Sequence, residues 1–433
     1  MNWTEDQVLQ LSPDASSTKA GLTQAKKEKW LILHKNDKAI WGEIKGSGKT
    51  PYQTVIDINN VAFKCTCPSR KFPCKHALGL FLVYARSPEA FTDKEPPEWA
   101  NKWLTSREQR EEKKKAKSEK PVDEKAQAKR VAAREQKVAE GIEEVTLWVK
   151  DLIRNGLVNI PERAYEFWQS TAARMVDAQA SGMAAMVRNL GKIDYTGEAW
   201  QEELLRQLVR IYMTAEGYKR LDSLPDNLQE DVKSLIGWTY NQEEIKAQDG
   251  IRDTWQVLGR TDEQEERLTT VKVWLYGQQT QRFALLLHFF APGQPRQVTL
   301  VPGMVMDASL AFYPGSVPLR ALIKEEFGTE AFESLSGLQD FNALEHECAR
   351  IVAQNPWMDE IPLVVESVIP VMEDKQIDLV DRENRKAAVS STFDKSWLLM
   401  ALSGGKPLTI FMIRKGSALL PLGAWSDAGY HLF

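Results

Sequence analysis

Residues 52–86, YQTVIDINNVAFKCTCPSRKFPCKHALGLFLVYAR, change their hydrophobic pattern halfway along. The first part alternates apolar and polar residues in short runs, which is typical of strands, whereas residues 76–85 form one apolar run typical of a buried helix. Three cysteines and one histidine stand between the two patterns, at Cys65, Cys67, Cys74 and His76. We therefore expect a strand, a turn and a helix, with these four side chains at the turn.

The spacing of these four residues predicts a metal site. Residues two apart on a strand point to the same face, so Cys65 and Cys67 can present both sulfurs together, and a six-residue loop can bring Cys74 and His76 opposite them. Zinc prefers thiolate and imidazole ligands, and four protein ligands leave no open position for water or substrate. We predict one structural Zn²⁺ here, against the alternative of four buried residues without metal.

The strand-like alternation continues toward the N-terminus. Four short runs separated by turn residues predict an antiparallel meander. They are KWLILHK (29–35), AIWGEIKG (39–46), YQTVIDI (52–58) and AFKC (62–65). Together with the helix after Cys74, they predict a small zinc-finger domain over residues 1–104.

Residues 105–140 have a different composition, with 12 basic and 8 acidic side chains. We expect a charged linker that passes into a long amphipathic helix, because apolar residues begin to recur every seven positions within it. These residues are Val131, Val138, Val145 and Leu152, with Ile142 and Val149 between them.

The rest of the chain divides into a helical and a β-rich part. Residues 141–250 are predicted to form a helical domain, in which one stripe at helical spacing packs in the core. That stripe consists of Tyr165, Trp168, Ala172, Met175 and Val176. Residues 251–433 contain strand-length apolar runs broken by Gly and Pro, which predicts a β-rich α+β domain. The expected fold class is α+β and multi-domain, and no repeat of fixed period is visible.

The net charge of −4 hides an asymmetry. Residues 1–140 have 27 basic and 19 acidic side chains, or +8, while the remainder has 29 and 41, or −12. The N-terminal third is therefore the part expected to face a polyanion.

Basic residues surround the predicted metal site, namely Lys64, Arg70, Lys71 and Lys75. They can offset the thiolate charge, contact nucleic-acid phosphates, or bind an acidic protein partner, and the sequence leaves all three open. Phe72, between the two prolines of the loop, is a candidate apolar contact for a protein partner.

Motifs for catalysis fail on inspection, so we predict no catalytic residues and no enzyme. The stretch 42–50 resembles a phosphate-binding loop, but its glycine spacing is wrong and an alternating strand follows instead of a helix. His346 and Glu347 lack the second histidine of a zinc protease, and Cys348 is expected to be buried. Without a long apolar run or a signal peptide at the N-terminus, we expect a cytoplasmic protein that does not contact a membrane.

The four candidate ligands match the SWIM zinc-finger pattern, Cys-x-Cys followed by Cys-x-His, and the chain resembles bacterial SWIM zinc-finger proteins. The resemblance extends to WGEIKGSGKTPYQTVID (41–57), CPSRKFPCKHALGL (67–80), AARMVDAQA (172–180), PLRAL (318–322) and ALSGGKPLTIF (401–411). It implies a finger that binds DNA or proteins. It also implies a link to MoxR-type AAA ATPases and von Willebrand A-domain proteins, which are found beside similar proteins.

Two hypotheses follow from these observations. The first is a zinc-binding, non-catalytic recognition or adaptor protein whose finger binds a protein partner or nucleic acid. The alternative is a regulatory protein that binds DNA or RNA independently of sequence.

Overall fold

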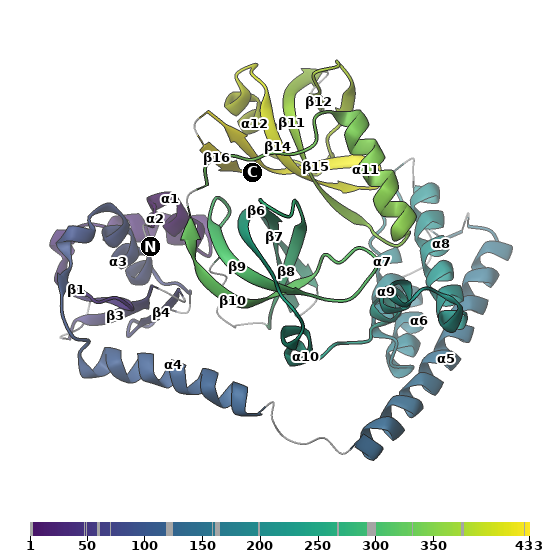
Figure 1. The fold of residues 1–433 in the computed structure, drawn as a ribbon, viewed down its shortest axis with the longest axis horizontal. Helices are drawn as coiled ribbons and strands as arrows, with labels where there is room; N and C mark the ends of the chain where they lie inside the picture. Colours follow the sequence, from purple (N-terminus) through teal and green to yellow (C-terminus); the bar gives the residue numbers. More distant parts are fainter. Residues whose placement is uncertain are drawn as a thin grey trace.

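The fold has an N-terminal αβ unit, a helical bundle and a β-rich C-terminal half, which lies between the other two in Figure 1. A computed structural model describes residues 3–46, 48, 50–58, 61–69, 71–117, 124–157, 159–160, 165–197, 200–265, 268–291, 300–330, 332–373, 376–427 and 429–433. The predicted α+β class and the order of its parts are confirmed.

The N-terminal unit is built on a five-stranded sheet in the order β4-β3-β2-β1-β5. Its strands are β1 (Trp30–Lys35), β2 (Ala39–Ile44), β3 (Tyr52–Asp57), β4 (Ala62–Cys65) and β5 (Thr92–Asp93). Strands β1 to β4 form the predicted antiparallel meander, and the short β5 adds a parallel edge beside β1. The helices are α1 (Glu5–Gln10), α2 (Ala15–Gln24), α3 (Lys75–Arg86) and α4 (Glu98–Lys117).

Helices cover both faces of this sheet. On one face, α3 buries Leu80 and Phe81 against Ile56 and Phe63 of the sheet. Helix α2 packs closely on α3 because Gly79 has no side chain, and a Cβ there would lie 2.5 Å from the Cβ of Gln24.

Helix α4 covers the other face of the sheet. Trp99 and Trp103 pack against Trp41 and Val55. The predicted domain end at residue 104 thus falls inside a helix, which continues to Lys117 because Glu, Lys, Arg and Gln all favour helical backbone.

The helical part contains α5 (Glu124–Arg154), α6 (Tyr165–Asp177), α7 (Ser181–Leu190), α8 (Trp200–Lys219), α9 (Asp226–Ile236) and α10 (Gln242–Ala247). Most of the predicted heptad residues are buried in its core, as are Trp168, Ala172 and Met175. Two expectations are wrong, since Val131 and Val176 are exposed. Val131 lies near the start of α5, which extends beyond the other helices in Figure 1, and Val176 is turned about 100° from Met175.

Residues 251–330 form a five-stranded sheet that curls toward a barrel. Its strands are β6 (Ile251–Glu265), β7 (Leu268–Gly277), β8 (Phe283–Phe290), β9 (Val305–Phe312) and β10 (Ala321–Glu330), in the order β10-β9-β6-β7-β8. A parallel bridge between Leu285 and Arg320 brings the third strand beside the start of the fifth.

The last hundred residues repeat this arrangement. Helix α11 (Phe341–Gln354) precedes β11 (Glu360–Glu373), β12 (Gln376–Val380), β13 (Lys386–Ala388), α12 (Ser396–Ser403), β14 (Leu408–Lys415), β15 (Ala418–Ser426) and β16 (Gly429–Leu432). The strand order is β13-β12-β11-β14-β15-β16, and a parallel bridge joins Val389 to Leu419.

Both units therefore share one connectivity. The first strand pairs with the second and fourth, the fourth pairs with the fifth, and the third meets the fifth in parallel, which is the connectivity of the OB fold, a partly open Greek-key barrel. We call residues 251–330 the first barrel and residues 360–426 the second barrel. The third and fourth connections differ in length between the two barrels, so the sequence has no fixed period.

Apolar contacts join the parts. The barrels share a core in which Trp274 and Phe283 of the first meet Phe411 of the second. Trp357, just before β11, is buried in the core of the helical bundle. Val301, from the connection between β8 and β9, is buried in the core of the N-terminal unit. The finger therefore contacts the first barrel directly, in addition to its covalent tether.

None of the helices described here combines the length and apolar character required to cross a lipid bilayer.

Candidate metal centre

The four predicted ligands come together at one point. The sulfurs of Cys65, Cys67 and Cys74 and a ring nitrogen of His76 all lie within 4.8 Å of one another. A tetrahedral zinc ion with metal–sulfur distances of about 2.3 Å separates its ligand atoms by about 3.8 Å. The separation of Cys65 Sγ and His76 Nδ1 is 3.8 Å. The donor set and its spacing therefore fit one Zn²⁺.

Three local elements position these ligands. Cys65 is the last residue of β4, and it pairs in register with Thr54 of β3. Cys74 is the N-cap of α3, and His76 lies in the first turn of that helix. The predicted strand, turn and helix are thus confirmed, and the helix N-terminus places the positive end of its dipole beside the thiolates.

Hydrogen bonding makes one of the three thiols strongly acidic. The pKa of Cys65 lies at about 4 because its thiolate accepts hydrogen bonds from Cys74, His76 and Thr54. The hydroxyl of Thr54 donates to Cys65 Sγ over 3.2 Å.

The pKa values of the other two thiols are shifted upward. Burial raises the pKa of Cys67, and the pKa of Cys74 is raised by its hydrogen bond to Cys65 and by burial. Without a cation the cluster thus favours a single thiolate. A divalent cation offsets the charge of all three, so the electrostatics of the site fit a metal.

Thr54 and Tyr52 contact the ligands, but neither belongs to the cysteine and histidine spacing that identified the site in the sequence. Thr54 is fully buried, and the ring of Tyr52 lies 5.1 Å from the ring of His76. Thr54 could have been found by extending the predicted β3–β4 pairing, because that register places it opposite Cys65.

The loop between the ligands packs on the finger itself. Phe72 is half-buried, and its ring meets that of Phe63 edge-on with centroids 5.9 Å apart. Part of the Phe72 ring therefore holds the loop in place, and only the remainder is exposed. Its role as a partner contact stays a prediction.

The basic residues near the site differ in their surroundings. Lys71 forms an ion pair with Asp14 at 2.8 Å, and this contact, with the backbone N–H of Ser17, holds the pKa of Asp14 at about 2. In the part of the chain that the structure describes, Lys64 and Lys75 are exposed without an ion-pair partner. Arg70 lies outside the described residues.

The rejected catalytic motifs have structural roles. Residues 42–44 of the stretch 42–50 belong to β2, which pairs antiparallel with β3 as its alternating continuation predicts, and residues 47 and 49 lie outside the described residues. Cys348 on α11 is buried among apolar residues of the second barrel, and burial raises its pKa. A thiol with a raised pKa is a poor nucleophile at neutral pH.

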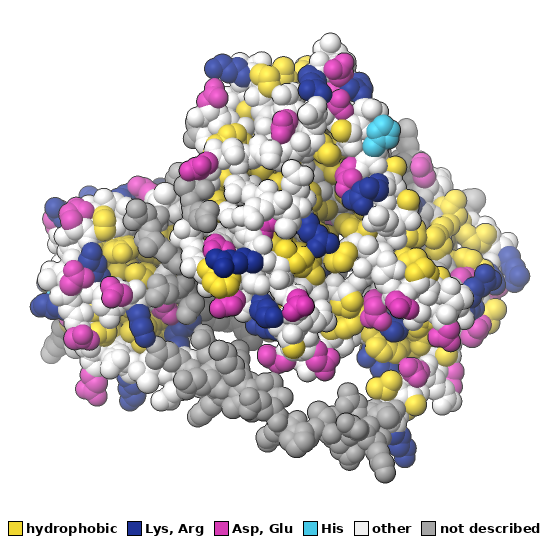
Figure 2. Space-filling view, viewed as in Figure 1, with side chains coloured by type: hydrophobic (Ala, Val, Ile, Leu, Met, Phe, Trp, Pro, Cys, Tyr) yellow, Lys and Arg dark blue, Asp and Glu magenta, His cyan; other side chains and the backbone are white. Residues whose placement is uncertain are grey.

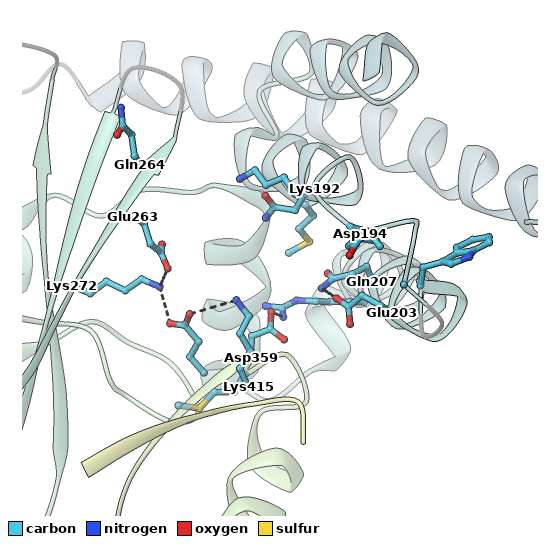
Figure 3. A pocket seen from close by; sticks show the side chains of 17 residues that line it. Lys192, Asp194, Glu203, Gln207, Glu263, Gln264, Lys272, Asp359 and Lys415 are labelled. Atoms are coloured by element: carbon cyan, nitrogen blue, oxygen red, sulfur yellow. Dashed lines mark hydrogen bonds and ion pairs between the residues drawn. The ribbon is translucent and has the colours of Figure 1, made fainter. Parts of the chain in front are cut away.

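A charged groove of about 1010 Å³ lies where the bundle meets the two barrels, and Figure 3 shows its lining. On the barrel side, Lys272 contacts Glu263 at 2.7 Å and Glu360 at 2.8 Å. On the bundle side, Arg206 and Arg210 of α8 reach Asp359, the residue before β11. Arg206 donates a hydrogen bond to Asp359 at 3.1 Å, and Arg210 forms an ion pair with it. The opposite charges within these contacts neutralise each other. The groove is therefore a junction between the helical bundle and the two barrels.

Comparison with protein families identifies two segments. Residues 52–85 match the SWIM zinc finger, and residues 133–236 match the SWIM-associated four-helix bundle domain. No curated protein and no solved structure matches the chain. The chain therefore carries a SWIM zinc finger with a Cys₃His site for one structural zinc ion, followed by the helical bundle that accompanies such fingers. The bundle match begins inside the segment predicted as a linker.

Proposed function

We propose that this chain is a non-catalytic cytoplasmic adaptor whose zinc-ordered finger binds a protein partner. SWIM fingers are in general interaction modules, and the closed Cys₃His ligand set supports a structural role for the metal. The free thiols of the site suit a reducing compartment.

The observation that favours a protein over nucleic acid is the pairing of basic side chains on the finger. Lys71 is held by Asp14, and Arg86 donates to Glu5 at 2.8 Å. Of the four basic residues around the site, Lys71 is paired and Arg70 lies outside the described residues, so Lys64 and Lys75 are the two described side chains left to contact phosphates. The resemblance to SWIM finger proteins makes MoxR-type AAA ATPases and von Willebrand A-domain proteins the first partners to test.

Salt dependence distinguishes the two kinds of partner. Two phosphate contacts predict that affinity for duplex DNA falls about 12-fold between 50 and 200 mM salt, by counterion release. A protein interface with a buried apolar centre depends far less on salt.

The experiment measures binding of the full chain to a purified ATPase, a purified A-domain protein, labelled duplex DNA and labelled single strands at both salt concentrations. The test variant is Lys64→Glu with Lys75→Glu, and the matched control is Lys395→Glu with Lys406→Glu on the second barrel. Salt-tolerant protein binding that weakens only in the test variant supports the proposal. Salt-sensitive DNA binding that disappears only in the test variant refutes it in favour of the nucleic-acid hypothesis.

A further inference from the structure

Helix α8 carries an apolar stripe on the side opposite the bundle core. Leu205, Val209 and Met213 are spaced four residues apart and are 46%, 47% and 39% exposed. Residues at this spacing lie on one face of a helix. Their neighbours Leu204 and Leu208 fill the core instead, so the stripe is not needed to hold the bundle together.

Helix α5 extends this apolar surface. The two helices run antiparallel, with the Lys150 ammonium 5.5 Å from the ring of Tyr212 and Lys219 3.3 Å from Glu143. Leu147 lies between these two contacts on α5 and is 57% exposed. Figure 2 shows hydrophobic side chains gathered over α5 and α8, at the right of the view. We call Leu147, Leu205, Val209 and Met213 the α5–α8 face.

All charged side chains of α8 except one are ion-paired within the chain. The exception is Glu202 in the first turn, which is exposed, and Arg220 directly after the helix is exposed as well. Neither side chain has an ion-pair partner among the residues that the structure describes. The paired side chains are Glu203 with Arg206, Arg206 and Arg210 with Asp359, and Glu216 and Glu143 with Lys219.

The two unpaired charges lie on the same side of the helix as the apolar stripe. Glu202 precedes Val209 by seven residues and Arg220 follows it by eleven. At 3.6 residues per turn, both separations are within about 20° of a whole number of turns. Arg220 continues the helical path, because its backbone N–H donates to the carbonyl of Glu216 at 3.2 Å. The stripe therefore has a free acidic group at one end and a free basic group at the other.

This arrangement makes the face complementary to itself. Consider α8 packed antiparallel against α8 of a second copy, with a two-fold axis at the level of Ile211. Val209 then meets Met213 of the second copy, because both are two residues from Ile211, and Glu202 meets Arg220, because both are nine residues from it. The symmetry forms each of these contacts twice.

The area of the face suits a dimer interface. Helix α8 has 20 residues. At about 1.5 Å per residue it is about 30 Å long, and two neighbouring helices about 10 Å apart form a face about 20 Å wide. Each copy would thus contribute about 600 Å², and the two together about 1,200 Å², which is the lower end of the range for specific interfaces.

We propose that the chain forms a two-fold symmetric dimer in which the α5–α8 face of one copy binds the same face of a second copy. Exposed apolar faces of this kind commonly mark sites of protein association, and the Glu202–Arg220 pairs set the register. The surface lies on the bundle rather than on the finger, so the proposal is independent of the function assigned to the finger. A dimer presents two fingers, which raises the avidity for a partner that offers two sites.

The test measures the molecular mass of the full chain by light scattering and sedimentation over a hundredfold range of concentration. We expect the mass to rise with concentration from 49.2 kDa toward twice that value. Val209→Asp should weaken dimerisation at least tenfold, because it places a carboxylate against Met213 of the second copy. Circular dichroism verifies that the variant is folded, and Val209→Ala provides a milder change if the aspartate disrupts the bundle.

Charge variants test the antiparallel register. Glu202→Arg and Arg220→Glu each place like charges opposite each other at two points of the interface, so each should weaken dimerisation about fivefold or more. In an equimolar mixture of the two variants, opposite charges meet again at both points, so a mixed dimer of wild-type strength should form. Glu383→Arg, which reverses an exposed charge on the second barrel, is the matched control and should change nothing.

A chain that stays monomeric over the whole concentration range would overturn the proposal, as would a dimer that both Val209 variants leave unchanged. A mixture of the two charge variants that dimerises no better than either variant alone would also overturn it, because the two copies would not meet in this register. The finger variant Lys64→Glu with Lys75→Glu should leave the dimer intact, so failure of this proposal is distinct from failure of the proposed function.

Discussion

Replacing Thr54 with valine should weaken zinc binding while leaving the sheet intact. Valine has nearly the shape of threonine and suits a strand, so the fully buried site keeps its packing. What is lost is the 3.2 Å hydrogen bond from the hydroxyl to Cys65 Sγ. Hydrogen bonds to charged groups contribute about 1.5–3 kcal/mol, and zinc shares the thiolate charge in the bound state. We therefore expect a loss near the lower end of this energy range, which is about a tenfold loss in zinc affinity. Substitutions of residues that hydrogen-bond to metal ligands typically have effects of this size.

The loss should also depend on pH in a defined direction. The hydrogen bond lowers the pKa of Cys65 in the metal-free finger, so its removal raises that pKa. A higher pKa lets protons compete with zinc at higher pH, so the difference between variant and wild type should grow as pH falls from 6 toward the wild-type pKa of about 4.

The assay is competition with a chromophoric chelator, with Thr54→Ser as the control that keeps the hydroxyl. Serine should retain most of the affinity. If Thr54→Val binds zinc within twofold of wild type, the hydrogen bond does not support the site. If serine loses as much as valine, packing of the methyl group explains the effect instead.

Four further predictions concern other contacts. Cys74→Ser should lose zinc and loosen the finger while the bundle and barrels stay folded, as measured by metal analysis and hydrogen exchange. Val301→Ala removes two buried methyl groups from the finger core and should cost about 2 kcal/mol in urea unfolding; a cost below 0.5 kcal/mol would show that the contact is dispensable. Asp359→Ala leaves Arg210 without its ion-pair partner at a partly exposed junction, while Arg206 keeps Glu203, and should cost about 1 kcal/mol, with protease sensitivity between bundle and barrels as a second readout. The depressed pKa of Asp14 means that its pair with Lys71 stabilises the fold above the unfolded pKa near 3.8, and that this contribution is lost as pH falls toward 2; Lys71→Ala should abolish that part of the acid dependence, as followed by fluorescence.

Local patterns in the sequence predicted the metal centre well. The meander, the helix after Cys74 and the four ligands all depend on periodicity and spacing within about sixty residues, and the structure places them as expected. The structure of the charged stretch after residue 104 was harder to predict, because its composition suits both a solvated linker and a helix. Trp99 and Trp103 favour the helix by anchoring its start on the sheet.

Features that join distant segments could not be predicted from the sequence. The two barrels close through parallel contacts between strands that are not neighbours in the chain, and periodicity carries no information about such pairing. The ion pair of Lys71 with Asp14 likewise depends on how α2 packs, so counting basic residues overstated the charge available on the finger.

The burial of Val301 in the finger has a consequence for the order of events during synthesis. All other buried members of that core lie between Trp3 and Phe91, about 210 residues earlier in the chain. At translation rates of about 5–20 residues per second, a newly made finger waits about 10–40 seconds for the valine that completes it. Zinc needs only residues 65–76, which leave the ribosome long before that. The metal can therefore order the nascent finger first, and cells short of zinc should expose its unfinished apolar surface to chaperones and proteases during this interval.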